Sequence, residues 1–513
     1  MKECRLLLSC ALVLILALAA SGARSEVTLP KILSSHMVLQ RGRPIHLWGW
    51  ADPGEQVKAT LRGTSISTQA STKADRIGNW SLYLPAEKAG GPYQVTITGT
   101  NTIVLDDVLI GDVWFASGQS NMQLPLMGFP HSAVVANGQQ EIENATNPNL
   151  RLLNMPMIAK PYPQEDQGAA WTLCTPQTAA TFSAAAYFFG REIAAHEHVS
   201  VGLIDSSYGG TPIKAWLSMQ ALGTDASLMP VFADWARFSA NQVTLPRIIA
   251  AEKRETAAAL AAGKPAPQFS WHPNYDSWAP SWLYNAMVAP AIKFPIKGVI
   301  WYQGASDSGL ERAAMYQREF PAMIADWRSD WKEGNFPFLF VQISSFTSTP
   351  EEDWAVIREA QRRTLSAADT AMAVTIDIGN PTNVHPADKQ DVGHRLALAA
   401  RALVYGEQVE YSGPLYRQTT TDGSQLKVWF DHAASGLVAQ GGPLTGFEIA
   451  GTDHKFVPAT ARIEGQSVVV SSPQVEKPKF VRYGWANSPT VNLFNGAGLP
   501  ASPFTSEKEI PKP

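Results

Sequence analysis

The chain has 513 residues and a formal net charge of −4, with 17% charged and 10% aromatic residues. It lacks the surplus of basic residues that binding to nucleic acid or to an anionic membrane surface requires, so we expect neither partner. The length predicts two to four domains, and the low charge density is typical of proteins that handle uncharged or polyhydroxylated ligands.

The N-terminus predicts a secretory signal peptide over residues 1–25. Lys2 and Arg5 precede an apolar stretch at 6–20, and small residues follow it. The apolar stretch is short for a membrane span. We therefore expect a secreted or periplasmic protein that has no membrane segment after cleavage.

Residues 26–107 predict an N-terminal β-sandwich-like domain. Short runs with alternating apolar residues occur at 45–50, 80–84 and 93–98. Turn residues rich in Gly, Pro and Asn separate these runs, as in antiparallel sheets.

Residues 108–408 change to short buried strands that alternate with amphipathic helices, which predicts a parallel sheet with helices on both faces. The strands are expected at 113–116, 201–205, 298–303, 338–343 and 372–377, with a further candidate at 152–155. The helices are expected near 184–195, 313–331, 356–365 and 386–405.

An insertion at about 219–280 interrupts this alternation. It contains an Ala-rich helix near 247–262, followed by Trp271 and Trp278. The insertion is either a lid or substrate wall, or a packing elaboration. After it, residues 409–513 predict a C-terminal β-rich domain with a polar tail.

Ser120 is the candidate nucleophile. It follows the apolar run 113–116 and the turn Gly118-Gln119, where a strand leads into a helix. A serine at this position can attack a carbonyl while neighbouring backbone N–H groups bind the oxyanion. The alternative is a helix N-cap serine, and Met122 stands where the α/β-hydrolase motif has a second glycine.

His385 is the candidate general base. In a parallel sheet, polar loops after the carboxyl ends of the strands meet at one edge, and His385 follows the last predicted strand. Pro386 suits the first position of a helix, so we expect His385 at the N-terminus of the helix 386–405. The alternative is a solvated capping histidine.

The oxyanion donors are expected on three strand-end loops. They are the N–H of Ser120, a backbone N–H of the Gly209-Gly210 turn, and the side-chain amide of Gln303. We also place Gln119 and Asn121, the neighbours of Ser120, among the binding residues. For the glycines a plain turn, and for Gln303 a buried structural amide, are the alternatives.

The residue that orients His385 stays open. Asp377 is the candidate for the third triad position, with Asp307 or a backbone carbonyl as alternatives, because Thr382 occupies the position three residues before the histidine. Asn380 and Asn383 are nearer but uncharged, and an amide stabilises an imidazolium less well than a carboxylate.

No metal or cofactor motif is present in the sequence: there is no His-Glu-x-x-His, no Ca²⁺-binding loop and no P-loop. We expect no cofactor. Cys174 is expected to be a buried structural thiol.

Together these motifs resemble the sialate O-acetylesterase family of SGNH-type carbohydrate esterases. The matching stretches are Gly111–Met122, Phe182–Ala184, Gly209–Trp216, Leu283–Asn285, Trp301–Gly304, Asp326–Arg328, Arg358–Gln361 and His385–Gln390 with Gly393 and Arg395. The resemblance implies an SGNH-hydrolase-like, flavodoxin-like central domain flanked by β-rich domains. It also implies Ser120 as nucleophile, His385 as base, and an oxyanion site formed by Ser120, the Gly209-Gly210 turn and Gln303.

The chain departs from the family at two places. Ala305 stands where the family usually has a carboxylate, and Asn380 and Asn383 stand where it usually has Asp. The sequence thus predicts a serine esterase for O-acetylated sugars, foremost sialic acids. The alternatives are an acetyl xylan (polysaccharide) esterase and a non-catalytic carbohydrate-binding protein on an esterase scaffold.

Overall fold

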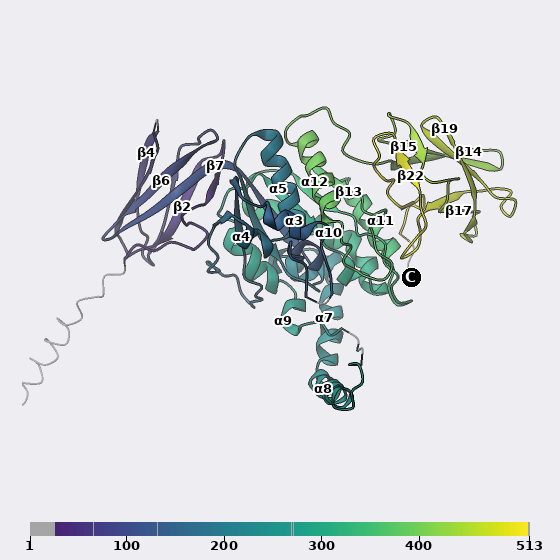
Figure 1. Ribbon diagram of the computed structural model, residues 1–513, viewed down its shortest axis with the longest axis horizontal. Helices are drawn as coiled ribbons and strands as arrows, with labels where there is room; N and C mark the ends of the chain where they lie inside the picture. The colour runs from purple at the N-terminus through teal and green to yellow at the C-terminus, as the bar shows by residue number, and fades with distance from the viewer. Residues whose placement is uncertain (1–25, 65, 131, 268, 270, 511–513) are drawn as a thin grey trace, which may run out of the picture.

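The computed structural model describes residues 26–510 except 65, 131, 268 and 270. Three bodies lie in a row: a β-rich N-terminal part, a central α/β part and a β-rich C-terminal part (Figure 1). The predicted signal peptide, residues 1–25, lies outside the described residues. Within the described part of the chain, none of the helices combines the length and apolarity that a membrane crossing needs.

The central body is built on a sheet with the strand order β13-β12-β11-β7-β10-β8-β9. All neighbouring pairs are parallel except β8 and β9. The strands are β7 (Thr102–Gly118), β8 (Asn147–Asn154), β9 (Thr172–Cys174), β10 (Val201–Ser207), β11 (Gly298–Tyr302), β12 (Phe338–Val341) and β13 (Thr370–Ala373).

Without the edge strands β8 and β9, the strands run second, first, third, fourth and fifth in chain order. This is the flavodoxin-like order, which confirms the predicted fold class. In such sheets ligands bind beyond the carboxyl ends of the strands, near the point where the order reverses. Here that point lies at β7, the strand that precedes Ser120.

Both faces of the sheet are apolar, because successive apolar residues of β7 point to opposite faces. A layer of helices covers each face. Val113 and Phe115 belong to one apolar cluster and Trp114 and Ala116 to the other. The main helices are α5 (Ala184–Glu197), α10 (Leu310–Trp331), α11 (Trp354–Thr364) and α12 (Lys389–Leu403), and the short ones are α2 (Ser120–Gln123), α3 (Gly138–Glu143) and α4 (Pro176–Ala180).

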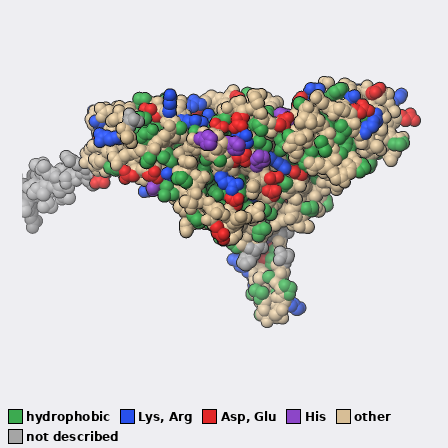
Figure 2. Space-filling view, turned by 45° about the horizontal axis from the view of Figure 1, so that its top comes forward, with side chains coloured by type: hydrophobic (Ala, Val, Ile, Leu, Met, Phe, Trp, Pro, Cys, Tyr) green, Lys and Arg blue, Asp and Glu red, His purple; other side chains and the backbone are tan. Residues whose placement is uncertain are grey.

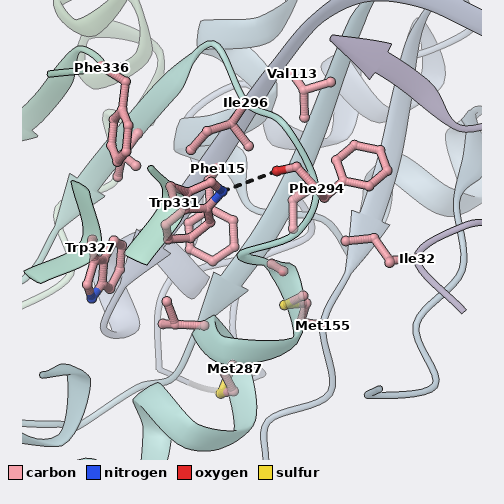
Figure 3. Packing of buried hydrophobic residues seen from close by; sticks show 14 of the residues in the cluster. Ile32, Val113, Phe115, Met155, Met287, Phe294, Ile296, Trp327, Trp331 and Phe336 are labelled. Carbon is pink, nitrogen blue, oxygen red and sulfur yellow. Dashed lines mark hydrogen bonds between the residues drawn. The ribbon is translucent and has the colours of Figure 1, made fainter. Parts of the chain in front are cut away.

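The core beneath α10 is rich in aromatic side chains. Figure 3 shows Phe115 packed beside Trp327 and Trp331, and the indole of Trp331 donates a hydrogen bond to the carbonyl of Phe294 at 3.1 Å. The other face is closed by α5 and α12, which pack side by side through residues such as Phe189 and Leu396. These two layers hold the strand ends, and thus the loops beyond them, in fixed positions.

Helix α12 begins at Lys389, three residues later than the sequence predicts. Asp388 caps the helix, since its carboxylate accepts a hydrogen bond from the N–H of Asp391 at 2.9 Å. His385 and Pro386 therefore lie in the loop before the cap rather than in the first turn. The expectation that His385 sits on the helix itself is corrected accordingly.

The N-terminal part consists of two sheets that enclose an apolar core. One pairs β2 (Ile45–Trp50) with β5 (Asn79–Leu84). The other contains β1 (Val38–Gln40), β3 (Gln56–Arg62), β4 (Ser67–Lys73), β6 (Gly90–Thr98) and the first half of β7. The expected domain boundary at 107/108 thus falls inside one continuous strand, and the division into domains stays a prediction.

The described residues of the insertion form the α-helices α6 (Met219–Thr224), α7 (Pro230–Asn241), α8 (Leu245–Ala261) and α9 (Tyr275–Trp278), with a short 3-10 helix at Ala226–Leu228. None of the residues of α8 is buried, and in Figure 1 this helix projects away from the central body. Segments that flank α8 return to the sheet edge, where they bring aromatic side chains next to the strand-end loops.

The C-terminal part is a set of small antiparallel sheets. Its strands are β14 (Leu415–Asp422), β15 (Gln425–Asp431), β16 (Leu437–Ala439), β17 (Phe447–Ala450), β18 (Val457–Pro458), β19 (Thr460–Glu464), β20 (Ser467–Ser471), β21 (Phe480–Tyr483), β22 (Leu493–Asn495) and β23 (Phe504–Thr505).

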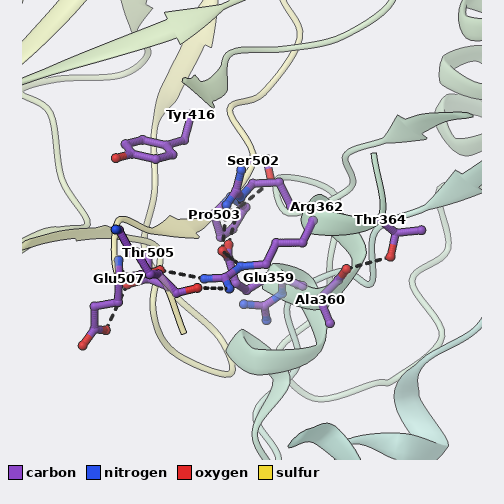
Figure 4. A network of polar contacts seen from close by, with 12 residues as sticks. Glu359, Ala360, Arg362, Thr364, Tyr416, Ser502, Pro503, Thr505 and Glu507 are labelled. Carbon is purple, nitrogen blue, oxygen red and sulfur yellow. Dashed lines mark hydrogen bonds and ion pairs between the residues drawn. The ribbon is translucent and has the colours of Figure 1, made fainter. Parts of the chain in front are cut away.

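Helix α11 joins the C-terminal part to the central body. Figure 4 shows Glu359 and Arg362 of α11 close to Thr505 and Glu507 of the C-terminal part. The buried Arg358 donates to the carbonyls of Ala486 at 2.8 Å and Asn487 at 2.5 Å, and to that of Ile343 at 3.2 Å. One guanidinium therefore satisfies carbonyls of both bodies.

We predict that Arg358→Met lowers the free energy of unfolding by about 3 kcal/mol, because buried carbonyls lose their donors. Chemical denaturation followed by circular dichroism measures the change. Arg363→Met is the matched control on the same helix. Its carbonyl partners at 507 and 508 are not buried, and its carboxylate partner Glu359 keeps both hydrogen bonds from Arg362, so a smaller loss is expected. Equal losses in the two variants would contradict the prediction.

Candidate active site

A cavity of about 700 Å³ lies beyond the carboxyl ends of the parallel strands. Its walls come from the loops after β7, β10, β11, β12 and β13 and from the insertion. The lining residues are Gln119, Ser120, Gln123, Phe129, Gly209, Gly210, Trp271, Pro273, Trp278, Ala305, Ser306, Arg312, Phe346, Glu352, Trp354, Val384 and His385. The structure thus brings Ser120 and His385, 265 positions apart in the numbering, to the walls of one cavity.

Ser120 is the first residue of the short helix α2, and Gln119 is its N-cap. The turn before it depends on Gly118, which has a φ of +137°. A Cβ there would lie 2.2 Å from the carbonyl oxygen of Tyr302 on the adjacent strand. Only glycine fits this approach, and the approach sets Ser120 at the cavity wall.

The Gly209-Gly210 turn lies directly against Ser120. A Cβ on Gly209 would lie 3.2 Å from Cβ of Ser120. The N–H of Gly209 donates to the side chain of Gln123 at 2.7 Å and so is already used. The N–H groups of Ser120 and Gly210 have no hydrogen-bond partner among the described residues. The backbone N–H of Asn121 likewise has no partner among the described residues, so three backbone donors beside the serine are available.

Gln303 lies beneath the cavity rather than on its wall. It is 1% exposed. Its amide nitrogen donates to the carbonyl of Thr211 at 3.1 Å and to Asp307 at 2.5 Å, and its oxygen accepts from Tyr316 at 2.9 Å. Because both N–H groups are used, the expected oxyanion role is corrected: in this structure Gln303 is a buried structural amide.

Gln119 and Asn121 point in different directions. The side-chain oxygen of Gln119 accepts from the N–H groups of Gly304 and Ser306, both at 3.1 Å, its amide nitrogen donates to Oγ of Ser306 at 3.3 Å, and the residue lines the cavity. Asn121 is 6% exposed and makes hydrogen bonds away from the cavity wall, to the His385 loop and to Lys389. Gln119 therefore remains a candidate substrate contact, whereas Asn121 connects two loops.

His385 is half-buried, and the edge-to-face contact with Phe129 positions its ring, with centroids 5.5 Å apart. Its Nε2 atom is buried and has no hydrogen-bond partner among the described residues. Burial, together with the positive charge of Lys389, lowers the pKa of His385 to about 4. The imidazole is therefore neutral at pH 7, as a general base must be.

Neither candidate carboxylate contacts His385. Asp377 forms a two-pronged ion pair with Arg395, with distances of 2.6 and 2.7 Å. Asp307 accepts from Gln303 and from the N–H of Ile213 at 2.9 Å. The proposal that Asp377 orients the histidine is thus corrected, because its oxygens are held by a guanidinium on α12.

The two asparagines before His385 make hydrogen bonds to backbone groups of the loops and none to the imidazole ring. Asn383 accepts from the backbone N–H of His385 at 2.9 Å and donates to the carbonyl of Ser132 at 2.8 Å. Asn380 accepts from the N–H of Thr382 at 2.9 Å. Within the described residues, no carboxylate makes a hydrogen bond or ion pair with the imidazole of His385.

Trp271, Trp278 and Arg312 are among the wall residues that the sequence did not individually assign to the site. Trp271 covers Gly210, where a Cβ would lie 2.4 Å from the indole. The indole of Trp278 donates to the carbonyl of Gly210 at 2.6 Å. The guanidinium of Arg312 lies 5.2 Å from the ring centre of Trp278. The tryptophans after the insertion helix were a visible signal, whereas Arg312 lies on a helix face that no motif marks.

Arg312 is the cation among the lining residues. Its Nε donates to the carbonyl of Ser306 at 3.2 Å, and its Nη1 lies 3.9 Å from a carboxylate oxygen of Asp234. Asp234 is more closely paired with Lys214. Much of the hydrogen-bonding capacity of the Arg312 guanidinium is therefore free for a ligand in the cavity.

Two other features concern metals and thiols. Among the described residues, no group of three or more His, Cys, Asp or Glu side chains could hold a metal ion. Cys174 is buried and donates to the carbonyl of Ala145 at 3.0 Å, and burial raises the pKa of its thiol to about 11.

On the face shown in Figure 2, acidic and basic side chains are interspersed.

Comparisons with known proteins give the family. The family model described as carbohydrate esterase, sialic acid-specific acetylesterase, matches residues 266–402. Sialate O-acetylesterase from Homo sapiens is 32% identical over 75% of this chain and 72% of its own, and that from Rattus norvegicus is 29% identical over 96% and 97%. A crystal structure of a carbohydrate acetylesterase from Xanthomonas citri is 37% identical, covers 94% of this chain and 100% of its own, and superposes with a TM-score of 0.80. The chain therefore belongs to the sialate O-acetylesterase family of carbohydrate esterases.

Proposed function

We propose that this protein is a serine esterase that hydrolyses O-acetyl esters of sugars, with sialic acids as the favoured substrates. The observation that carries the proposal is the shared cavity, which has Ser120 and a neutral His385 on its wall and aromatic side chains around them. The predicted signal peptide supports the further proposal that the protein is exported.

The reaction begins when Oγ of Ser120 attacks the acetyl carbonyl and His385 takes the hydroxyl proton. The carbonyl oxygen becomes an oxyanion, which the N–H groups of Ser120 and Gly210 are free to bind. The tetrahedral intermediate then collapses, and His385 returns the proton to the leaving sugar oxygen. An acetyl-Ser120 ester remains.

Water completes the cycle by the same route. His385 removes a proton from a water molecule, which attacks the acetyl carbonyl and forms a second oxyanion on the same donors. Collapse breaks the bond to Ser120, whose oxygen regains the proton, and acetate leaves. The proposed machinery is a Ser-His dyad, since Asp377 and Asp307 are held by other partners.

The cavity wall suits a sugar. Aromatic side chains line the cavity, and the exposed ring of Trp271 presents a flat apolar surface to the C–H face of a pyranose, while a few polar groups fix its orientation. Arg312 supplies the cation that the carboxylate of a sialic acid requires. The chain as a whole is acidic, with a net charge of −4, so this cation supplies a local attraction for the carboxylate.

An acetylated polysaccharide is the second candidate substrate. Trp271 is 63% exposed and lines the cavity, so it offers further contact area to a longer glycan. The two substrates differ in charge, and Arg312 distinguishes them. The third possibility is a non-catalytic carbohydrate-binding protein. Such a protein would bind sugars without needing the hydroxyl of Ser120 as a nucleophile.

We predict that Ser120→Ala lowers the turnover of acetylated sugars by at least about 10³-fold. The hydroxyl supplies the nucleophile and little packing, so the melting temperature should stay within a few degrees. Acetate release from O-acetyl sialic acid and from acetylated xylan measures the loss. Asp377→Asn is the control: per folded molecule its kcat should fall less than tenfold. More than a tenth of wild-type activity in Ser120→Ala would exclude Ser120 as the nucleophile.

We predict that the acid limb of kcat/KM lies near pH 4, well below the pKa of about 6.5 of an ordinary histidine side chain. Burial and Lys389 favour the neutral base, so acid must reach this pH before His385 is protonated. A pH–rate profile at constant ionic strength measures the limb, with circular dichroism to show that the fold persists. A half-maximal rate above pH 6 would contradict this prediction.

We predict that Arg312→Gln raises KM for O-acetyl sialic acid by about 10- to 100-fold, the effect of losing a charge-assisted hydrogen bond. KM for acetylated xylo-oligosaccharide should change less than threefold. Arg237→Gln is the matched control, since Arg237 lies at the same distance of 3.9 Å from Asp234 but outside this cavity. Equal effects on the charged and the neutral substrate would refute a carboxylate-binding role.

A further inference from the structure

A buried lysine lies beside the loops that carry Ser120 and His385, and no carboxylate of the described residues forms an ion pair with it. Lys389 is 0% exposed. Its Nζ donates to Oδ1 of Asn121 at 2.6 Å and to the carbonyl of Pro386 at 2.9 Å, and lies 5.4 Å from the ring centre of Tyr302. An ammonium held by neutral acceptors in the interior is costly. Its position therefore calls for an explanation beyond stability.

The second half of the arrangement is the amide of Asn121. Its Nδ2 donates to the carbonyl of Val384 at 2.9 Å. Asn121 follows Ser120 directly, whereas Val384 and Pro386 stand immediately before and after His385. Asn121 and Lys389, with the carbonyls of Val384 and Pro386, form a closed set of hydrogen bonds that we call the amide clip. It connects the serine to both sides of the histidine.

The amide clip is placed where a triad carboxylate would otherwise act. No carboxylate among the described residues holds the imidazole, so its position depends on the backbone of its loop and on Phe129. Displacing a reacting group by 1 Å costs on the order of 10²-fold in rate. Something must therefore fix the loop that carries His385 relative to the helix that carries Ser120.

We propose that Asn121 and Lys389 are positioning residues that set the Ser120–His385 geometry in place of a histidine-orienting carboxylate. This rests on the proposed esterase function. Neither side chain touches the substrate, because both point from the cavity wall into the protein. Asn121, expected from the sequence among the binding residues, acts on the reaction through its neighbours.

The charges around Lys389 make the proposal testable by pH. From its own segment Asp388 and His385 face it, from β11 the Tyr302 ring does, and α2 contributes the neutral amide of Asn121. Burial lowers the pKa of Lys389 to about 7, and its charge in turn lowers that of His385. Removing the lysine should therefore raise the pKa of the histidine.

The experiment compares Lys389→Met, Asn121→Ala and the double variant by kcat, KM and the rate of Ser120 labelling with a fluorophosphonate. Each single variant should lose about 10²-fold in kcat and in labelling rate, with KM changed less than threefold. The double variant should lose no more than the larger single loss, because both residues act in one set of bonds. In Lys389→Met the acid limb of kcat/KM should move toward pH 6.5.

Arg395→Met is the matched control, since it removes another buried cation from the same helix, one that is paired with Asp377 outside the clip. It should keep kcat within threefold per folded molecule. Asn121→Asp, which keeps the volume and the lysine contact but loses the donor to Val384, serves if the alanine variant does not fold.

Two outcomes overturn the proposal separately from the esterase function. Wild-type labelling rates in folded Lys389→Met or Asn121→Asp, while the wild type is labelled at Ser120, would refute the clip alone. So would losses that add in the double variant. A wild-type protein that is neither labelled nor active on acetylated sugars would refute the esterase function, and the clip with it.

Discussion

The structure depends on one continuous strand, β7, which belongs to two sheets. Its first half pairs with β6 in the N-terminal part, and its second half lies between β10 and β11 at the centre of the parallel sheet. Side chains of the second half alternate between two apolar clusters, so the strand is fixed on both faces. Ser120, the proposed nucleophile, comes two residues after this strand ends, so its position is determined by a strand that is fixed on both faces. The tight approach of Gly118 to Tyr302 passes that constraint on to the turn.

The sequence was sufficient for the elements and for the gathering of the strand-end loops. Apolar runs separated by helical periodicity predict a parallel sheet, and the topology of such a sheet brings Ser120, Gly209 and His385 together. The start of α12 was predicted three residues early, because Pro386 is a strong helix-start signal. The actual cap, Asp388, depends on one side-chain hydrogen bond. Boundaries of this kind follow from local competition between two capping signals.

The roles of the polar residues could not be predicted in the same way. Gln303 and Asp307 lie after the right strand, but they bind each other, and Asp377 binds Arg395. A sequence shows that an amide or a carboxylate is near the sheet edge, but not which donor reaches it first. Arg312 illustrates the converse: it enters the cavity from the exposed side of α10, where a charged residue is ordinarily solvated. Such assignments require three-dimensional distances.

Among the described residues, the proposed Ser-His dyad has no carboxylate to stabilise the imidazolium of His385. The negative charge that does so must therefore come from the reaction itself. A pKa of about 4 makes His385 a weaker base than a free imidazole by roughly 3 kcal/mol, and a carboxylate that could offset this is absent from its hydrogen-bond partners in the described chain. In the proposed mechanism, the charge that stabilises the imidazolium is then the oxyanion itself, formed on the N–H groups of Ser120 and Gly210 in the same step. Attraction between these two charges is strong only if their separation is short and water is excluded. The amide clip, which joins the loops that carry them by hydrogen bonds, meets the first condition, and a substrate that fills an aromatic cavity meets the second. In such a site, proton transfer depends on how precisely the two loops are held, and for this reason the proposal assigns an effect on the rate to a lysine and an amide outside the reacting atoms.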